Sequence, residues 1–432
     1  MQTNLAPQYQ GTPEGQEAEA ILRSCVHCGF CTATCPTYQL LGDELDGPRG
    51  RIYLIKQVLE GAEAGPGTQL HLDRCLTCRN CETTCPSGVQ YGRLLDIGRG
   101  IVERQVPRPA AQRAARTLLR EVLPRGWIFK PAMKAGQLLR PVLPAALRGK
   151  VARATPPGRW PTASHARKML LLDGCVQPAM APNINAATAR VLDALGIELV
   201  MAPKAGCCGA IRYHLNDQEG GLDDMRRNID AWWPAVEEGA EAIVMTSSGC
   251  GVTVKDYGHL LRHDAAYAAK AARIAMLTRD ISEILCDFED ALAARIDSVH
   301  ARSVAFHPPC TLQHGQQIRG KVEGLLRAVG VDVRLCADSH LCCGSSGTYS
   351  LLQPELSGQL RERKLAALHA TDAEEIVSAN IGCQSHLQGG TGTPVGHWIE
   401  LLDRLLQQSS QPSQDQARRR SQAPGGRPHA AA

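Results

Sequence analysis

One pattern of cysteines occurs twice near the start of this chain and constrains its fold more than any other feature. The segments "CVHCGFCTATCP" and "CLTCRNCETTCP" both read C-x2-C-x2-C-x3-C-P. Three thiolates spaced by two residues can surround one corner of a small inorganic cluster. The fourth thiolate, followed by proline, is carried away from that corner. In proteins with two such runs, the fourth cysteine of each run ligates the other cluster.

The two runs therefore predict two [4Fe–4S] clusters with exchanged ligands. The first head set is Cys25, Cys28, Cys31 and Cys85, and the second head set is Cys75, Cys78, Cys81 and Cys35. Zinc is the alternative, but structural zinc sites pair two C-x2-C units across a longer loop. Two complete copies of the tighter spacing favour iron–sulfur clusters.

The segment between the runs predicts a helical insert and contains two arginines of interest. Arg49 and Arg51 lie in "LGDELDGPRGRIYLIKQVLE". If they lie against a cluster, their charge raises its reduction potential. The alternative is that they form ion pairs with the nearby acids Asp43, Glu44 and Asp46.

Composition bears on the cellular environment and on partners. The opening segment has neither the basic nor the apolar region of a signal peptide, which predicts a cytoplasmic protein. In that reducing environment, the 18 cysteines indicate metal binding rather than disulfides. No apolar run approaches the roughly 20 residues of a membrane span. A net charge of +4 and 4% aromatic residues argue against nucleic-acid binding.

The later part of the chain contains an internal repeat. "KMLLLDGCVQP", "APKAGCCGA" and "EAIVMTSSGCG" recur as "SVAFHPPCTLQ", "HLCCGSSGT" and "EEIVSANIGCQ". The same interval separates Cys175 from Cys310 and Cys207 from Cys342. Short apolar runs that alternate with helical patterns predict βαβ units with parallel strands, and the cysteines follow the carboxyl ends of those strands.

Each repeat thus supplies four thiols at one sheet edge. The first body set is Cys175, Cys207, Cys208 and Cys250, and the second body set is Cys310, Cys342, Cys343 and Cys383. We expect these eight thiols to converge between the two repeats. His307 and His386 lie near the second body set, although a lone histidine is usually structural. Cys286 and Cys336 stand outside both sets and are expected to be buried as apolar residues.

The expected organisation has five parts and mixes α+β and α/β character. A helical, ferredoxin-like head with two clusters is followed by a basic, Pro/Arg-rich linker, two cysteine-rich repeats and a disordered tail. Their ranges are 17–103, 104–166, 167–300, 301–406 and 407–432. In the linker, Leu118, Leu119, Val122 and Leu123 could form one apolar helical face. The linker is expected to form short helices along the body, and the alternative is a basic docking surface.

These motifs resemble a known family. The vicinal "GCCGA" and "LCCGS" segments resemble the cysteine-rich domain shared by heterodisulfide reductases and by iron–sulfur subunits of flavin dehydrogenases. "CVHCGFCTATCPTY", "DGPRGRIYLIK", "CLTCRNCETTCPSGV" and "LDGCVQP" resemble the iron–sulfur subunits of bacterial glycolate oxidases in particular. The resemblance covers nearly the whole chain except the tail.

The resemblance implies a subunit of a complex that oxidises glycolate, and D-lactate as a further substrate, to the 2-oxo acid. No G-x-G-x-x-G opens a helix after a strand, so FAD is expected on partner subunits and no substrate chemistry in this chain alone. Electrons would pass to a membrane acceptor, the quinone pool, from a complex peripheral to the inner face of the cell membrane.

Two alternatives remain open. The chain could serve a glycerol-3-phosphate or lactate dehydrogenase, or it could be a thiol/disulfide catalyst like heterodisulfide reductase. The full reductase motif ends in C-x2-C, whereas Cys250 and Cys383 are followed at that spacing by Thr253 and His386. This departure leaves open whether the body sets bind clusters, a weaker metal site or a partner.

Overall fold

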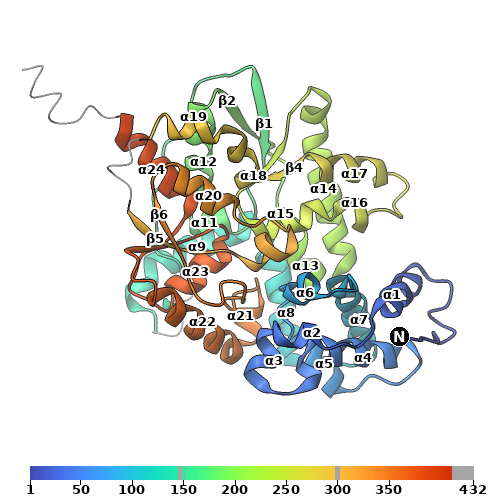
Figure 1. Cartoon of the computed structure of the whole chain (residues 1–432). Helices are drawn as coiled ribbons and strands as arrows, with labels where there is room; N and C mark the ends of the chain where they lie inside the picture. Colours follow the sequence, from blue (N-terminus) through green and yellow to red (C-terminus); the bar gives the residue numbers. More distant parts are fainter. Residues whose placement is uncertain (145–147, 150, 297–301, 411–432) are drawn as a thin grey trace, which may run out of the picture.

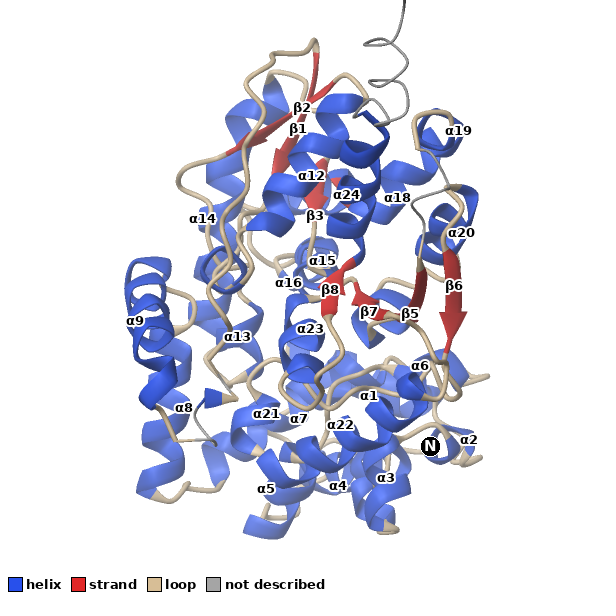
Figure 2. Ribbon diagram, turned by 90° about the vertical axis from the view of Figure 1, so that its left-hand side faces the viewer, coloured by secondary structure: helices blue, strands red, loops and turns tan. Residues whose placement is uncertain are grey.

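The computed structural model describes residues 1–144, 148–149, 151–296 and 302–410. A helical head lies against one end of a body that contains two parallel sheets (Figures 1 and 2). The predicted fold class, a helical two-cluster head followed by two βαβ-type repeats, is confirmed.

The head is built from short helices around a small apolar core. Its helices are α1 (Pro13–Ser24), α2 (Phe30–Ala33), α3 (Pro36–Leu41), α4 (Pro48–Leu59), α5 (Pro66–Asp73), α6 (Asn80–Thr84) and α7 (Tyr91–Gln105). Four of them, α1, α3, α4 and α5, begin at proline, whose fixed φ suits the first helical position. Leu22, Leu59, Leu94 and Leu95 are fully buried in the core. The helical insert predicted between the cysteine runs is present as α4.

The linker forms two helices that run from the head along the first repeat, α8 (Ala110–Val122) and α9 (Gly126–Leu139) (Figure 2). Gln137 on α9 donates a hydrogen bond to the carbonyl of Ala179. The predicted apolar face is only partly covered, because Leu118 is 63% exposed and no residue of α8, all of which is described, is fully buried. Short helices along the body are therefore observed.

Each repeat contains a four-stranded parallel sheet of the same topology. The strands of the first are β1 (Arg167–Leu171), β2 (Ile197–Met201), β3 (Ile243–Met245) and β4 (Thr278–Asp280), in the order β2-β1-β3-β4. Those of the second are β5 (Ser303–His307), β6 (Asp332–Leu335), β7 (Glu375–Ser378) and β8 (Val395–His397), in the order β6-β5-β7-β8. Arg167 pairs with Ile197 in the first sheet, and Ser303 pairs with Asp332 at the corresponding place in the second.

Helices connect and cover the strands, as parallel pairing requires. In the first repeat they are α11 (Gln177–Met180), α12 (Asn183–Ala194), α13 (Ala210–His214), α14 (Gln218–Glu237), α15 (Ser248–Lys255), α16 (Tyr257–Leu260), α17 (Ala268–Leu277), α18 (Ile281–Leu285) and α19 (Glu289–Ala293). In the second they are α20 (Lys321–Ala328), α21 (Tyr349–Leu352), α22 (Pro354–His369), α23 (Ile381–Gln388) and α24 (Trp398–Ser410). Helix α24 thus extends into the segment expected as a tail; residues 411–432 lie outside the described residues.

The two repeats share one apolar core and form a single body. Leu171 and Val244 from the first sheet and Phe306, Val377 and Trp398 from the second repeat belong to the same buried cluster. Polar contacts reinforce this union. Arg190 on α12 forms a bidentate ion pair with Asp403 on α24, with a shortest N–O distance of 2.7 Å. The carboxyl edges of the two sheets are therefore held in a fixed relation.

Among the described residues, no helix combines the length and the apolarity that a membrane span requires.

Candidate metal centres

The two cysteine runs of the head adopt the same backbone conformation. His27 and Gly29 in the first run have positive φ angles of 57° and 87°, and Thr77 and Arg79 at the same places in the second have 54° and 59°. Three of these residues are not glycine, and such strain concentrates at functional sites. The conformation turns backbone N–H groups inward. One example is the Thr77 N–H, which lies 3.4 Å from the sulfur of Cys75.

The cysteines of the first head set lie together in the fold. Burial raises the pKa of the Cys31 thiol to about 11, and the neighbouring thiols of Cys25, Cys85 and Cys28 add to this effect. Cys85, from the second run, is thus a neighbour of the first run. Four neighbouring thiols are suited to a cation, which would displace their protons.

The second head set is grouped in the same way. Burial and then the thiols of Cys78, Cys75 and Cys35 hold the pKa of Cys81 well above its usual value. A small cavity is lined by all four of these cysteines and by Arg51. The donor set here and in the first head set consists of four thiols, and this chemistry fits an iron–sulfur cluster. Both fourth cysteines lie with the run to which they do not belong in sequence.

The two arginines of the insert form the ion pairs expected as the alternative, and they also lie near cysteines of the head sets. Arg51 and Asp46 are almost fully buried and form an ion pair at 3.3 Å. Burial lowers the pKa of Arg51. The net pKa is nevertheless raised, with contributions from the thiols of Cys75 and Cys35 and from the Asp46 carboxylate. Arg49 binds Glu44 at 2.6 Å, and a smaller attraction to Cys31 helps to raise its pKa. Each arginine is therefore ion-paired and also close to one head set.

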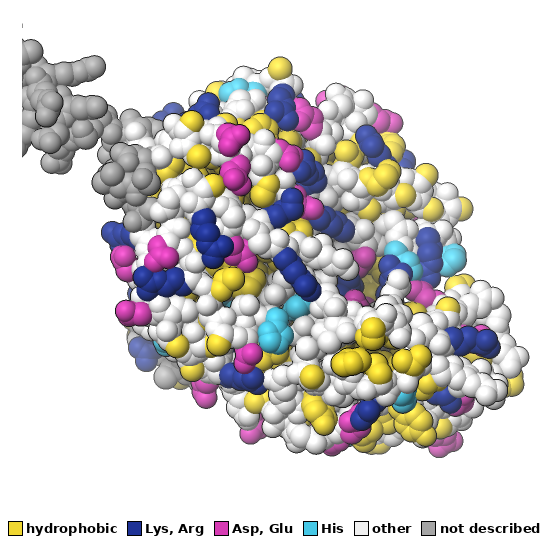
Figure 3. All heavy atoms as spheres, viewed as in Figure 1, with side chains coloured by type: hydrophobic (Ala, Val, Ile, Leu, Met, Phe, Trp, Pro, Cys, Tyr) yellow, Lys and Arg dark blue, Asp and Glu magenta, His cyan; other side chains and the backbone are white. Residues whose placement is uncertain are grey.

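The head sets differ in their access to solvent. Cys28 of the first set is the only exposed residue among the 18 cysteines, all of which the structure describes. Val26 and Phe30 beside it are 68% and 61% exposed, and hydrophobic side chains gather on this face of the head around α2 and α4 (Figure 3). The second head set faces the body instead.

The first body set gathers at the carboxyl edge of the first sheet. Cys175 follows β1, Cys207 and Cys208 follow β2, and Cys250 lies on α15 after β3. The thiols are neighbours in the order 175, 207, 208 and 250, and the nearby thiol of Cys207 together with burial holds the pKa of Cys175 well above its usual value. Asn228 fixes the vicinal pair by donating to the carbonyl of Cys207 at 2.7 Å.

The second body set has the same arrangement at the second sheet. The sulfur atoms of Cys310 and Cys342 are 3.8 Å apart, and the series continues through Cys343 to Cys383. Of the two nearby histidines, His307 lies beside Cys343 and Cys383. The Nε2 atom of His386 lies 3.2 Å from the hydroxyl of Ser357.

One large cavity, of about 800 Å³, connects the head with both body sets. Its walls include Cys75 and Cys78 from the head and seven of the eight body thiols; Cys343 is not among the described residues that line it. The predicted convergence of the body thiols between the repeats is confirmed for those seven.

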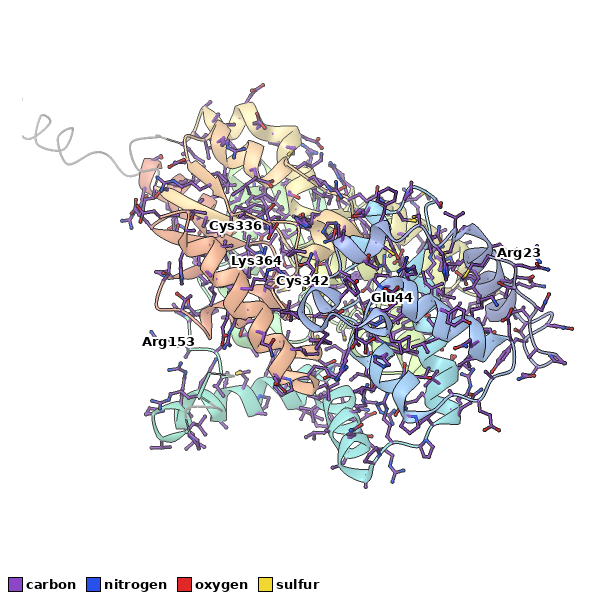
Figure 4. All side chains as sticks on the ribbon, turned by 60° about the horizontal axis from the view of Figure 1, so that its bottom comes forward. Arg23, Glu44, Arg153, Cys336, Cys342 and Lys364 are labelled. Carbon is purple, nitrogen blue, oxygen red and sulfur yellow. The ribbon has the colours of Figure 1, made fainter. Side chains whose placement is uncertain are left out.

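The second head set lies directly against the second body set. Burial and then the thiol of Cys310 raise the pKa of Cys78. The pKa of Cys342 is affected first by its neighbours Cys310 and Cys343, is raised by burial, and is raised further by a smaller effect of Cys78. Ser346, just after the vicinal pair, donates to the carbonyl of Leu76 at 2.5 Å. Figure 4 shows Cys342 on the side of the second repeat that faces the head. Sequence reasoning missed this juxtaposition, because no motif reports how the head docks.

The two cysteines outside the sets differ from each other. Cys336 is 6% exposed and packs in an apolar cluster, as expected. The expectation was wrong for Cys286, which is half-buried in a short 3₁₀ turn with its sulfur 3.8 Å from the carbonyl of Lys321.

The head and the two repeats match two known domain families. A 4Fe-4S dicluster domain matches residues 21–89. A cysteine-rich domain matches twice, at residues 169–255 and 304–388. The matches coincide with the head and with the two repeats.

Curated relatives resemble the chain over most of its length. It is 56% identical to the glycolate oxidase iron-sulfur subunit of Escherichia coli (strain K12), over 94% of this chain and 100% of the relative. It is 30% identical to the probable glycolate oxidase iron-sulfur subunit of Bacillus subtilis (strain 168), over 86% of this chain and 89% of the relative. A lactate utilization protein A of Bacillus licheniformis is 28% identical over 55% of this chain and 99% of its own length.

Proposed function

We propose a role for each head set from the premise that this chain belongs to the family of glycolate oxidase iron–sulfur subunits. The chain is the electron-transfer subunit of an oxidoreductase complex that oxidises glycolate. It carries iron–sulfur clusters, and FAD-binding subunits of the same complex are its partners.

The head cysteines are the proposed cluster ligands. Cys25, Cys28, Cys31 and Cys85 would hold one [4Fe–4S] cluster, and Cys75, Cys78, Cys81 and Cys35 the other. When bound, each cluster supplies a site that accepts and releases one electron. The observation that carries this proposal is the exchange of Cys35 and Cys85 between the two runs, since each lies among the thiols of the opposite run.

The positions of the two sets suggest a direction for electron flow. The first head set reaches the surface at Cys28, which favours it as the point of entry from the flavin-bearing partner. The second head set lies beside Cys310 and the large cavity, which favours it as the inner carrier. Arg51 would stabilise the added negative charge there, because it is buried next to Cys35 and Cys75.

We further propose the membrane quinone pool as the final acceptor and the inner face of the cell membrane as the location of the complex. A chain of one-electron carriers needs an acceptor that takes electrons singly, and a quinone has this chemistry. This chain would reach the membrane through its partners.

A related substrate is the second candidate. The likeness to lactate utilization protein A favours a role in lactate oxidation, with the same relay chemistry and a different flavoprotein partner. The thiol/disulfide catalyst is less favoured, because Thr253 and His386 stand where a terminal thiol would complete each body set.

A subunit experiment tests the proposal. Expressed alone and loaded with clusters, the chain should show no glycolate oxidation with an artificial electron acceptor, because iron–sulfur clusters pass single electrons and the hydride acceptor is proposed to be the flavin of the partner. Addition of the flavin-bearing partner should restore activity. Glycolate oxidation by the flavin-free chain alone would contradict the relay role.

A further inference from the structure

The linker is the basic part of a chain that is otherwise acidic. Residues 104–166 contain 13 lysines and arginines and one acidic residue, Glu121, whereas the whole chain has 47 lysines and arginines and 43 acidic residues. Glu121 already forms ion pairs with Arg125 and Arg212. The exposed basic residues of the linker include Arg113, Lys130, Lys134, Arg148 and Arg153. The linker therefore has a positive charge that no acid of its own segment balances.

The same segment exposes large apolar side chains. Among the described residues, the three most exposed large hydrophobic side chains are Leu138 at 82%, Val142 at 78% and Trp127 at 76%. Trp127 and Leu138 lie on α9, and Val142 ends the 3₁₀ turn that follows it. Exposed apolar groups that gather in one place mark a contact with a protein or a membrane. The linker thus combines positive charge with apolar surface.

Four of these residues form a stripe along α9. Trp127, Pro131, Lys134 and Leu138 follow one another at intervals of four, three and four residues, which places them on one face of the helix. All four are exposed, and we call them the α9 stripe. The helix is fixed from another side, where Phe129 is 8% exposed. Helix α9 lies at the edge of the molecule in Figure 2, and the linker helices form its lower edge in Figure 4.

We propose that the α9 stripe binds an anionic lipid surface, to which the exposed basic residues of the linker are attracted. Tryptophan and leucine next to lysines are typical of helices that lie in a membrane interface, because the apolar groups enter the lipid while the lysines reach the headgroups. Lys134 lies between Trp127 and Leu138 on the stripe, and lysine is depleted from the core of protein interfaces. This difference favours lipid over a protein as the occupant.

The inference rests on the proposed location of the complex at the inner face of the cell membrane. Partners would bring the chain there, and the α9 stripe would add a lipid contact that belongs to this chain. The linker is fastened to the head, because Arg116 on α8 forms an ion pair with Asp73 on α5 at 2.9 Å. It is fastened to the first repeat by the hydrogen bond of Gln137 to Ala179. Lipid contact at α9 would therefore orient the whole chain relative to the membrane.

Vesicle binding by the purified complex tests this proposal. The complex should sediment with vesicles of phosphatidylcholine and phosphatidylglycerol, and much less with vesicles of phosphatidylcholine alone. Lys134→Gln removes one positive charge and should weaken binding by about fivefold. Leu138→Asp should weaken it further, because it removes an apolar contact and adds a charge that the lipid repels. Met276→Asp, at a 71% exposed position on α17, is the matched control and should bind as the wild type does.

Tryptophan fluorescence gives a second measurement, which does not rest on a charged variant. Brominated lipids quench a tryptophan that enters the bilayer, so they should quench the part of the wild-type fluorescence that Trp127→Phe removes. Absence of this quenching would contradict the proposal.

Three results of the vesicle experiment would overturn the proposal. They are equal binding to the two kinds of vesicle, unchanged binding by Leu138→Asp, and a smaller protein assembly in that variant, which would identify the stripe as a protein interface. Vesicle binding is scored separately from glycolate oxidation with a soluble acceptor. Failure here therefore leaves the relay role intact.

Discussion

Cys35 and Cys85 each stand beside a proline at the end of a cysteine run, and each lies with the other run in space. This exchange ties the two ligand loops together, because neither cluster could be completed without a residue from both. The spacing alone predicted it. The reason is local. The spacer of three residues before the fourth cysteine and the proline after it direct the fourth thiol away from the first three thiols of the same run.

Replacement of Cys35 by serine tests the exchanged ligation. The variant should lose or alter the cluster held by Cys75, Cys78 and Cys81, and the cluster of the first run should remain. EPR of the reduced protein distinguishes the two centres. Cys336→Ser, at a buried cysteine outside all four sets, should leave both signals intact. Loss confined to the centre of the first run would show that the pairing is wrong.

Arg49 and Arg51 allow a paired test of electrostatic tuning. Arg51→Gln removes a buried positive charge beside Cys35 and Cys75, so the reduction potential of the second centre should fall by on the order of 100 mV. Arg49 is 38% exposed, and solvent weakens its field, so Arg49→Gln should shift the first centre by less. Redox titration followed by EPR measures both. Equal shifts of the two centres in either variant would contradict the assignment.

At the scale of elements, the ends of the parallel strands set the position of the chemistry. β1, β2 and β3, like β5, β6 and β7, deliver cysteines to one edge of their sheets. Another contact at this edge joins the repeats. His397 at the end of β8 donates from Nε2 to the carbonyl of Thr246, 3.0 Å away, and its Nδ1 accepts the N–H of Ile399 at 3.2 Å.

This contact predicts a dependence of stability on pH. Burial lowers the pKa of His397 to about 4, against 6.5 when unfolded. The unfolded chain therefore binds the proton more readily, and the stability that depends on the neutral ring is lost as pH falls from about 6.5 toward 4. On α24, the carboxylate of Glu400 accepts a hydrogen bond from the backbone N–H of His397 at 3.4 Å.

Denaturant unfolding at pH 7 and pH 5 measures the effect. His397→Met should lower the free energy of unfolding at pH 7. At pH 5 the difference in this free energy between the variant and the wild type should be smaller by about 2 kcal/mol, because the wild type no longer has the stabilisation that depends on the neutral His397 ring. His369→Met, at an exposed position, is the matched control. An equal deficit at both pH values would show that His397 does not titrate as described.

Sequence and structure agree on the elements and differ on how these elements meet. The spacing of the cysteines along the chain was enough to predict which thiols group together. The internal repeat was enough to predict two parallel sheets with the same strand order. Two features escaped prediction because they depend on distant packing. These are the contact of Cys78 with Cys310, which requires the docked head, and the partial exposure of Leu118, which requires knowledge of what covers α8.

At the scale of the whole molecule, the head is held to both repeats. Arg79 forms an ion pair with Asp256 of the first repeat at 3.0 Å, and the Thr83 hydroxyl lies 2.9 Å from Nδ1 of His314 in the second. These contacts flank the second head set and fix it at the large cavity. The first head set remains on the outer side, where Cys28 is exposed. The molecule thus has one head set that reaches solvent and one that is enclosed by its own body.

In the proposed relay, electrons from glycolate pass through this chain. The most direct test adds glycolate, without oxygen, to the purified complex and follows the iron–sulfur absorbance together with EPR. Glycolate should bleach the absorbance and produce the signals of reduced [4Fe–4S] centres, and the same addition to the isolated chain should change nothing. Reduction of the flavin alone, with both centres left oxidised, would contradict it.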